Sequence, residues 1–231
     1  MGKNKLAQWA EMKSFNNVIE PKTEEVYSID HYLKGNWNKT IFKNNNPVIL
    51  ELGCGKGEYT VGLATRFPMN NYIGIDIKGA RMWRGSKTAH ENNISNAAFL
   101  RTRIEFINSF FKEDEVDEIW ITFPDPHPKR RSSSKRLTSP NFLNSYRPFL
   151  KDGGIIHLKT DNKDLYDYTR KVVSRNDLDI IISTDDLYSG LIENEILSIR
   201  THYEKIFLDK GIKICYLSFR LKKYTAITDV A

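Results

Sequence analysis

Two acids and three glycines form the first pattern in this sequence that predicts chemistry. Glu51 lies in an apolar run, and the loop after that run has glycine at every second position, Gly53, Gly55 and Gly57. A second apolar run leads directly into Asp76. Glycine permits positive φ and a close approach of backbone to ligand. Because parallel strands end at one edge of a sheet, the two acids predict a site for a ligand with hydroxyls and positive charge.

S-adenosylmethionine suits this pattern because it carries a sulfonium, an ammonium and a ribose diol, and no phosphate. A dinucleotide site requires Gly-x-Gly-x-x-Gly, whose last glycine opens a helix that holds a pyrophosphate. This chain has Glu58 at that place, and a carboxylate there repels the pyrophosphate. We therefore predict that Asp76 accepts hydrogen bonds from the ribose and that Glu51 lies near the positive groups. A dinucleotide site and a turn without a ligand are the alternatives.

A proline-rich loop after the fourth predicted strand is the second candidate. Asp125 lies between two prolines, which stiffen the backbone, and a loop at this strand end is expected to face the reactive end of the cofactor. Five cations follow within a short stretch, Lys129, Arg130, Arg131, Lys135 and Arg136. We predict that Asp125 is catalytic and that the cations contact phosphates. The alternatives are a turn residue and a solvated charged face.

Two further residue types in this region lead to weaker expectations. His127 lies between two prolines, where a packing or stacking role is favoured over acid–base catalysis. The histidines, cysteines and acids of the chain do not have the spacing of metal ligands, so no metal site is predicted.

Strand and helix patterns alternate from residue 47 onward and must position these loops. The predicted strands are 47–52, 71–76, 97–102, 118–123, 154–159, 178–184 and 212–221, and the predicted helices are 58–67, 79–92, 104–111, 140–150, 163–175 and 195–209. Such alternation predicts an α/β fold with a mostly parallel seven-stranded sheet, helices on both faces and an antiparallel last strand. Residues 1–46 are predicted to form an arm, helical around 5–12 and 29–35 or flexible, before one domain, 47–231.

Composition favours an ordinary globular chain. The 231 residues suffice for one α/β domain, and the net charge of +6 permits a polyanionic partner without requiring one. No apolar stretch approaches the ~20 residues that a membrane span needs. The two distant cysteines, Cys54 and Cys215, favour reduced thiols and a cytoplasmic location.

These segments together resemble the bacterial tRNA (guanine-N7)-methyltransferases over about residues 47 to 221. The matching segments are Glu51–Gly57, Gly74–Asp76, Phe123–Pro126, Lys129–Arg131, Lys159–Asn162 and Thr201–Glu204. The resemblance implies a Rossmann-like class I methyltransferase fold that uses S-adenosylmethionine. Its substrate is then a guanosine in the tRNA variable loop, at tRNA position 46.

The resemblance also implies roles for individual residues. Glu51, Asp76 and Asp125 correspond to cofactor-binding or active-site acids, and the implied substrate-binding positions are Lys129, Asp161, Thr201 and Glu204. This chain departs from the family pattern at two places. Arg103 replaces an acid that touches the adenine, so the guanidinium is expected to stack on or hydrogen-bond to that ring. His127 replaces a tryptophan.

The chemistry of the implied reaction fits a site without a strong base. Guanine N7 offers an in-plane lone pair and needs no deprotonation before it attacks a methyl group. A fixed carboxylate near N7 stabilises the positive charge that develops there, which we predict for Asp125, while Asp161 binds the N1 and amino edge. The A-form major groove is deep and narrow, so a displaced base is expected.

Three rival functions remain open at this point. A methyltransferase acting on another RNA or on a non-RNA acceptor would keep the cofactor half of the pattern. A non-enzymatic RNA-binding protein and a dinucleotide-dependent oxidoreductase are the others. The expected partner is tRNA, with no membrane and no metal, and the chain is a monomer or a homodimer.

Overall fold

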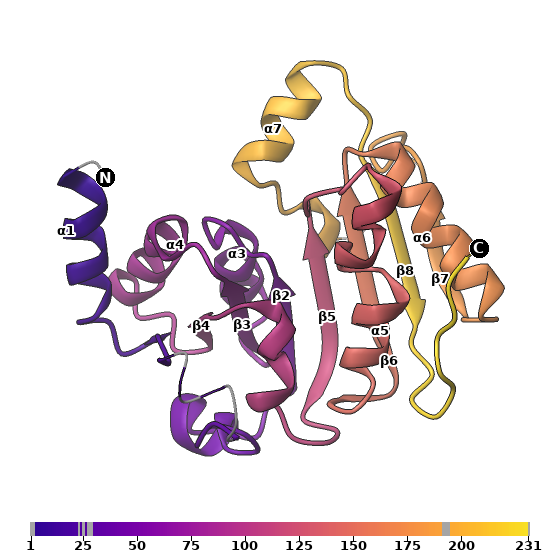
Figure 1. Ribbon diagram of the computed structural model, residues 1–231. Helices are drawn as coiled ribbons and strands as arrows, with labels where there is room; N and C mark the ends of the chain where they lie inside the picture. The colour runs from indigo at the N-terminus through magenta and orange to yellow at the C-terminus, as the bar shows by residue number, and fades with distance from the viewer. Residues whose placement is uncertain (1–2, 23, 25, 27–29, 191–194, 231) are drawn as a thin grey trace. The chain divides into compact units, whose positions relative to one another are not determined.

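The chain folds into two compact units, Met1–Lys112 and Glu113–Ala231 (Figure 1). A computed structural model describes residues 3–22, 24, 26, 30–190 and 195–230. Both units are α/β, with strands whose side chains are mostly buried and helices between them.

The first unit contains four strands in the order β1-β4-β3-β2, all parallel. Its elements are α1 (Lys3–Met12), β1 (Val18–Ile19), the π-helix η1 (Asn38–Phe42), β2 (Val48–Leu52), α3 (Glu58–Arg66), β3 (Asn71–Asp76), α4 (Gly79–Glu91), β4 (Ala97–Arg101) and the 3₁₀-helix η2 (Ile104–Ser109). Every residue of β2 is buried, as expected of a parallel strand covered on both faces. The register pairs Leu52 with Ile75, so the chain after β2 and Asp76 leave the sheet side by side.

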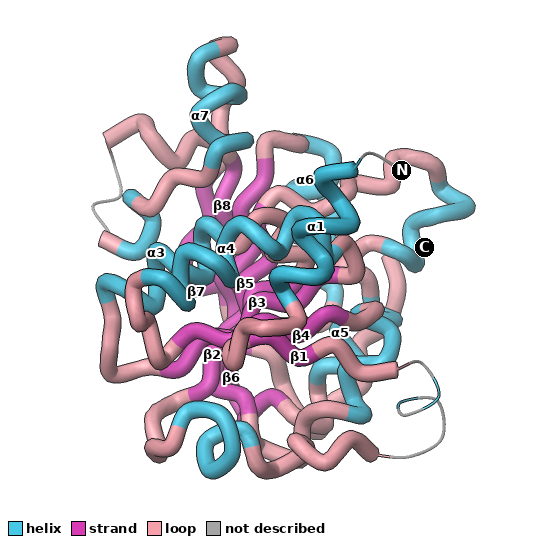
Figure 2. Tube along the Cα trace, turned by 90° about the vertical axis from the view of Figure 1, so that its left-hand side faces the viewer, coloured by secondary structure: helices cyan, strands magenta, loops and turns pink. Residues whose placement is uncertain are grey.

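The arm that precedes β2 packs against the first unit. Trp37 is fully buried, donates its indole N–H to the carbonyl of Phe110 at 2.9 Å and stacks on Phe111. Helix α1 lies alongside α4 (Figures 1 and 2), and β1 adds a strand to β4. The helix expected around 5–12 is confirmed, whereas residues 30–35 form a turn instead of a helix and residue 29 lies outside the described residues.

The second unit contains four strands in the order β5-β6-β8-β7. Its elements are β5 (Val116–Thr122), the 3₁₀-helix η3 (Arg130–Lys135), α5 (Pro140–Tyr146), β6 (Leu150–Thr160), α6 (Lys163–Arg175), β7 (Ile180–Thr184), the short 3₁₀-helix η4 (Ile196–Ser198), α7 (His202–Asp209) and β8 (Cys215–Arg220). Strands β5 and β6 are parallel, and β8 is antiparallel to both β6 and β7. Figure 1 shows α7 beyond the carboxyl end of β5.

These observations confirm the predicted α/β class and the antiparallel last strand. The described residues contain eight strands rather than seven, because the arm contributes β1. Three predicted helices differ from the structure. The segment 104–111 forms only a 3₁₀-helix, the helix from Pro140 ends at Tyr146 because β6 begins at Leu150, and the segment 195–209 is divided by an extended Thr201.

Helix α4 touches the glycine loop at Gly85. A Cβ on Gly85 would lie 2.5 Å from the carbonyl oxygen of Lys56 and 2.8 Å from the Cα of Gly57, and both contacts are with backbone. Only glycine therefore allows this helix to pack against the loop after β2 at the observed distance.

Gly85→Ala is expected to lower the melting temperature, although the same change in an open helix stabilises by up to about 1 kcal/mol. The added methyl group pushes against backbone that cannot move aside, which costs on the order of 1–3 kcal/mol. Thermal unfolding of Gly85→Ala measures the change in melting temperature. Thr88→Ala, at a half-buried position of the same helix, is the control. A melting temperature at or above that of the unaltered chain would contradict the close contact.

Candidate functional site

The loop after β2 takes the backbone conformation that its glycines permit. Gly53, Gly55 and Gly57 have φ values of 74°, 55° and 69°, all in the left-handed region. Gly53 and Cys54 both donate their N–H groups to the carbonyl of Ile75, at 2.8 and 3.1 Å. The loop is thereby fixed to the end of β3. A ligand can approach the partly exposed Gly53 and Gly55, whereas Gly57 is buried against Phe99 and Gly85.

Asp76 is held at the end of β3 by two backbone groups. Its Oδ2 accepts the N–H of Gly55 at 2.9 Å, and its Oδ1 accepts the N–H of Lys78 at 2.7 Å. The side chain is half-buried. A carboxylate oxygen has more than one lone pair, so Asp76 keeps acceptor capacity for the hydroxyls of a ribose while its orientation is fixed.

Glu51 is the more buried of the two acids, with 3% of its surface exposed. Its Oε2 accepts from both the N–H and the hydroxyl of Thr60, at 2.8 and 2.5 Å. Gly57, the residue before α3, offers no side chain as a cap, and the carboxylate of Glu51 satisfies one of the helix's first N–H groups instead. Glu51 therefore anchors α3 beside the glycine loop. Burial raises the pKa of the nearby Cys54 thiol well above its usual value, and the negative charges of Glu51 and Asp76 add to that shift.

Arg103 lies on the wall of a cavity of about 740 Å³ in the first unit. The cavity also contains Ile77, which follows Asp76, and the arm residues Glu20 and Pro21. The guanidinium of Arg103 is exposed and lies 3.3 Å from the carboxylate of Glu105. The described arm thus lines a cavity next to the end of β3, where Asp76 lies, and the sequence did not indicate this contribution.

The Pro-Asp-Pro turn after β5 is bounded by two residues in an uncommon conformation. Phe123 and His127 have φ values of 49° and 43°. Residues other than glycine adopt such positive φ values at a cost of about 1–3 kcal/mol. The Asp125 side chain is 73% exposed, and its Oδ1 accepts the N–H of His127 at 3.2 Å. Surrounding contacts must hold this turn, and it presents Asp125 to solvent.

The predicted phosphate-binding cations separate into two groups. Lys129, Arg130, Arg131 and Lys135 are exposed and have no ion-pair partner among the described residues. Arg136 instead donates to the carbonyls of Pro126 and His127, at 3.2–3.3 Å, and lies over the ring of Tyr168. Arg136 therefore braces the Pro-Asp-Pro turn from within the unit, and the phosphate contact predicted for it stays a prediction.

Lys159 and Asp161 are positioned by the end of β6. The carbonyl of Lys159 accepts the N–H of Phe123 at 2.8 Å, which ties the Pro-Asp-Pro turn to this strand end. Asp161 follows in a half-buried place, where burial raises the pKa of its carboxyl above the usual value. A carboxylate with a raised pKa in a partly accessible position is typical of a functional site.

The ammonium of Lys159 is completely buried and has three acceptors. It lies 2.8 Å from Oε1 of Glu204 and donates to the carbonyls of Leu197 and Ile199, each at 3.1 Å. Burial lowers the pKa of Lys159, and Glu204 opposes that shift. Since an ammonium has three donors, the side chain is fully satisfied and fixes the segment before α7 to β6.

Thr201 and Glu204 form a capping box at the start of α7. The hydroxyl of Thr201 accepts the N–H of Glu204 at 3.2 Å, and Oε2 of Glu204 accepts the N–H of Thr201 at 3.3 Å. Tyr188 donates its hydroxyl to Oε1 of Glu204 at 2.5 Å. Glu204 is fully buried and Thr201 is 8% exposed. This environment gives both residues a structural role, and their predicted contacts with substrate stay predictions.

Each unit therefore brings one set of predicted residues together. The first unit joins Glu51, the glycine loop and Asp76, with Arg103 on the neighbouring cavity wall. The second joins Asp125, Asp161 and the capped start of α7. Within α7, the ring of Phe207 lies 5.9 Å from the ring of Phe123, measured between centroids. Within the described residues, no three His, Cys, Asp or Glu side chains are grouped to hold a metal ion, and no helix could span a membrane.

Comparison with solved structures defines the class of fold. The 16S rRNA methyltransferase KamB matches with a TM-score of 0.61 at 12% identity, over 83% of this chain and 95% of that chain. A family model described as "Putative methyltransferase" matches residues 45–217. The chain thus has the class I methyltransferase fold.

Curated relatives define the family more narrowly. A tRNA (guanine-N(7)-)-methyltransferase of Bacteroides fragilis is 49% identical over 96% of this chain and 87% of its own length. The protein of that name from Porphyromonas gingivalis is 56% identical over 82% of this chain and 77% of its own. The chain belongs to the tRNA (guanine-N(7)-)-methyltransferase family.

The Lys159–Glu204 pair predicts a pattern of stabilities. Lys159→Met and Glu204→Leu are each expected to destabilise by about 3–5 kcal/mol, because each leaves one charge buried without its partner. The double variant is expected to recover part of that loss. Denaturant unfolding of the three variants measures both effects.

The exposed ion pair Lys163–Asp167 in α6 provides the control. Because that pair is solvated, Lys163→Met is expected to change stability by less than about 1 kcal/mol. If Lys159→Met were no more destabilising than Lys163→Met, the buried pair would not have the role assigned to it.

Proposed function

We propose that this chain transfers a methyl group from S-adenosylmethionine to N7 of a guanosine in the tRNA variable loop, tRNA position 46. The observation that carries the proposal is membership of the family together with an intact set of acids, Glu51, Asp76, Asp125 and Asp161. The first three accept backbone N–H groups of their own unit.

The first unit has the donor set that the methyl donor requires. Asp76 retains acceptor capacity for ribose hydroxyls, and the partly exposed backbone at Gly53 and Gly55 is accessible to the amino-acid portion. Arg103 and Ile77 line a cavity with room for a planar base. Glu58 at the start of α3 opposes a pyrophosphate in the same place. When bound, S-adenosylmethionine supplies an electrophilic methyl group.

In the second unit we assign acceptor recognition to Asp125 and Asp161. Guanine N7 attacks with its own lone pair, so no residue needs to remove a proton first. Positive charge then develops on the purine, and the exposed carboxylate of Asp125 stabilises it. Asp161 accepts hydrogen bonds from the guanine N1–H and amino group.

The exposed cations Lys129, Arg130, Arg131 and Lys135 hold the phosphates that flank the guanosine. Arg136 acts differently, because its guanidinium is bonded to the carbonyls of the Pro-Asp-Pro turn and holds Asp125 in place. Lys159 and Glu204 act through the segment that they anchor and are positioning residues.

The decisive experiment is methylation of unmodified tRNA by the purified chain, followed by nucleoside analysis and mapping of the product. The proposal expects 7-methylguanosine at a single position in the variable loop. A different methylated nucleoside, methyl transfer to another class of acceptor, or no binding of S-adenosylmethionine by calorimetry would refute it.

Asp125→Asn is expected to reduce the single-turnover methylation rate by about 10²-fold, because the amide has the shape of the acid without its charge. Asp164→Asn, an exposed change in the first turn of α6, is the matched control and is expected to retain the rate. A near-normal rate for Asp125→Asn would remove Asp125 from the catalytic role.

Asp161→Asn is expected to separate stability from function. Because burial raises the pKa of Asp161 in the folded state, its contribution to stability is favourable below that pKa and is lost as pH rises through it. At neutral pH the amide therefore leaves the melting temperature equal or higher, while KM for tRNA increases. For the unaltered chain, the methylation rate is expected to fall as pH drops through the raised pKa of Asp161. A lower melting temperature and an unchanged KM in Asp161→Asn would contradict this assignment.

A further inference from the structure

A second cavity in the first unit lies between helix α1 and the start of α4. Its volume is about 510 Å³. We call it the α1–α4 cavity. The residues that line it are Lys5, Gln8, Trp9, Ile77, Lys78, Gly79, Ala80, Arg81 and Arg101. Four of these residues are cationic and none is acidic, so the cavity favours an anion.

The positive charge of the cavity is only partly neutralised. Arg101 is paired with Glu20 at 2.9 Å and lies 5.2 Å from the ring centroid of Trp9. Lys5, Lys78 and Arg81 are exposed and have no ion-pair partner within the described ranges. The first turn of α4 has no acid and no side-chain cap, so the positive end of the helix dipole adds to these three charges.

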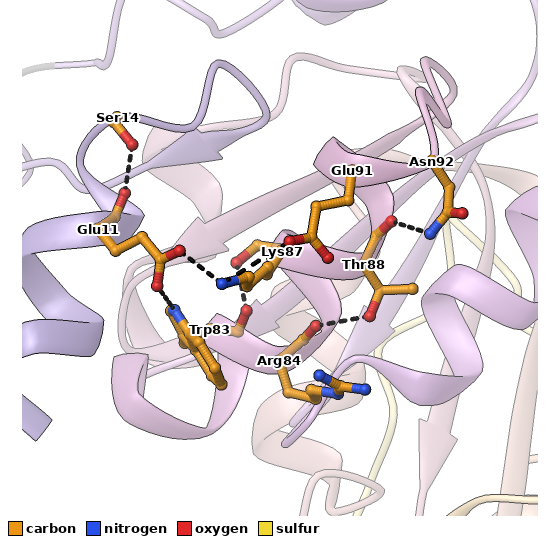
Figure 3. Close-up of polar contacts among 9 residues, drawn as sticks. Glu11, Ser14, Trp83, Arg84, Lys87, Thr88, Glu91 and Asn92 are labelled. Carbon is orange, nitrogen blue, oxygen red and sulfur yellow. Dashed lines mark hydrogen bonds and ion pairs between the residues drawn. The ribbon is translucent and has the colours of Figure 1, made fainter. Parts of the chain in front are cut away.

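Helix α1 is held in place by contacts outside the cavity. Glu11 accepts the indole N–H of Trp83 and pairs with the ammonium of Lys87, both at 2.7 Å (Figure 3). These two partners lower the pKa of Glu11, with Lys87 the larger cause. The only acid of α1 is thus used against the middle of α4.

The face of α1 toward the cavity follows from helical spacing. Lys5, Gln8 and Trp9 recur at intervals of three and four residues and therefore share one face, which continues to the fully buried Met12. Gly79 permits the close packing, since a Cβ there would lie 2.8 Å from Nε of Arg101 and 3.1 Å from Cε of Met12.

We propose that the α1–α4 cavity binds a backbone phosphate of the RNA substrate, as a contact separate from the cations that follow Asp125. The proposal rests on the proposed function, which supplies a polyanionic partner. The volume exceeds what a free phosphate ion needs, and an aromatic ring beside cations is a combination that single-stranded nucleic acid uses. Lys78 also links the cavity to the cofactor acid, because its N–H binds Asp76.

Affinity for unmodified tRNA, measured without cofactor over a range of salt concentrations, tests the inference. Arg81→Gln and the double variant Lys5→Gln/Lys78→Gln are expected to weaken tRNA binding several-fold. Each lost phosphate contact lowers the slope of log affinity against log salt by about 1. Arg84→Gln is the matched control, since Arg84 is exposed on the same helix and does not line the cavity.

Equal effects of Arg81→Gln and Arg84→Gln, or an unchanged salt slope in the double variant, would overturn the proposal. Inorganic phosphate provides a further arm. Suppose that phosphate binds the unaltered chain and does not bind the double variant, while the two proteins bind tRNA with equal affinity. The cavity is then a site for a small anion, and the proposal is wrong. A chain that binds tRNA in this way and methylates no N7 would refute the proposed function alone.

Discussion

The ammonium of Lys159 is fully buried, and the second unit is arranged around the acceptors that it requires. Two carbonyls, of Leu197 and Ile199, and the carboxylate of Glu204 satisfy its three donors. A buried charge without such partners would be expelled or neutralised. The segment before α7 therefore has one place to lie, against the end of β6. The Pro-Asp-Pro turn attaches to the same strand end, because Phe123 donates its N–H to the backbone carbonyl of Lys159. One residue thus holds the segment before α7 with its ammonium and the turn with its carbonyl.

The first unit uses carboxylates in the same way, to satisfy backbone groups. Glu51 receives two hydrogen bonds from Thr60, and Asp76 receives one from Gly55 in the loop after β2 and one from Lys78 after β3. These bonds orient the acids before any ligand arrives, which reduces the ordering that binding requires. Asp76 keeps lone pairs for a ligand, whereas Glu51 is 3% exposed and acts mainly by holding α3 beside the glycine loop.

Periodicity and glycine spacing predicted much of this arrangement. Helix 163–175 was placed correctly because Asn162 caps it, and the three loop glycines have the positive φ that their pattern indicates. The helix expected from 195 was wrong in its first turns, because Thr201 caps α7 and buried Lys159 holds the preceding residues by their carbonyls. Such a long-range partner leaves no local pattern. For the same reason the sequence did not indicate that the arm lines two cavities of the first unit.

Charge in a sequence does not distinguish a cation that builds the protein from one that meets a ligand. Arg136 and Arg131 belong to one basic stretch, yet Arg136 is bonded to two carbonyls and Arg131 is exposed. Arg101 and Arg81 differ in the same manner, since Arg101 is paired with Glu20. An arginine whose donors are already bonded has to lose those bonds before it can bind a phosphate, and that loss offsets the gain. We therefore expect a phosphate to bind the cations that the fold has left unbonded.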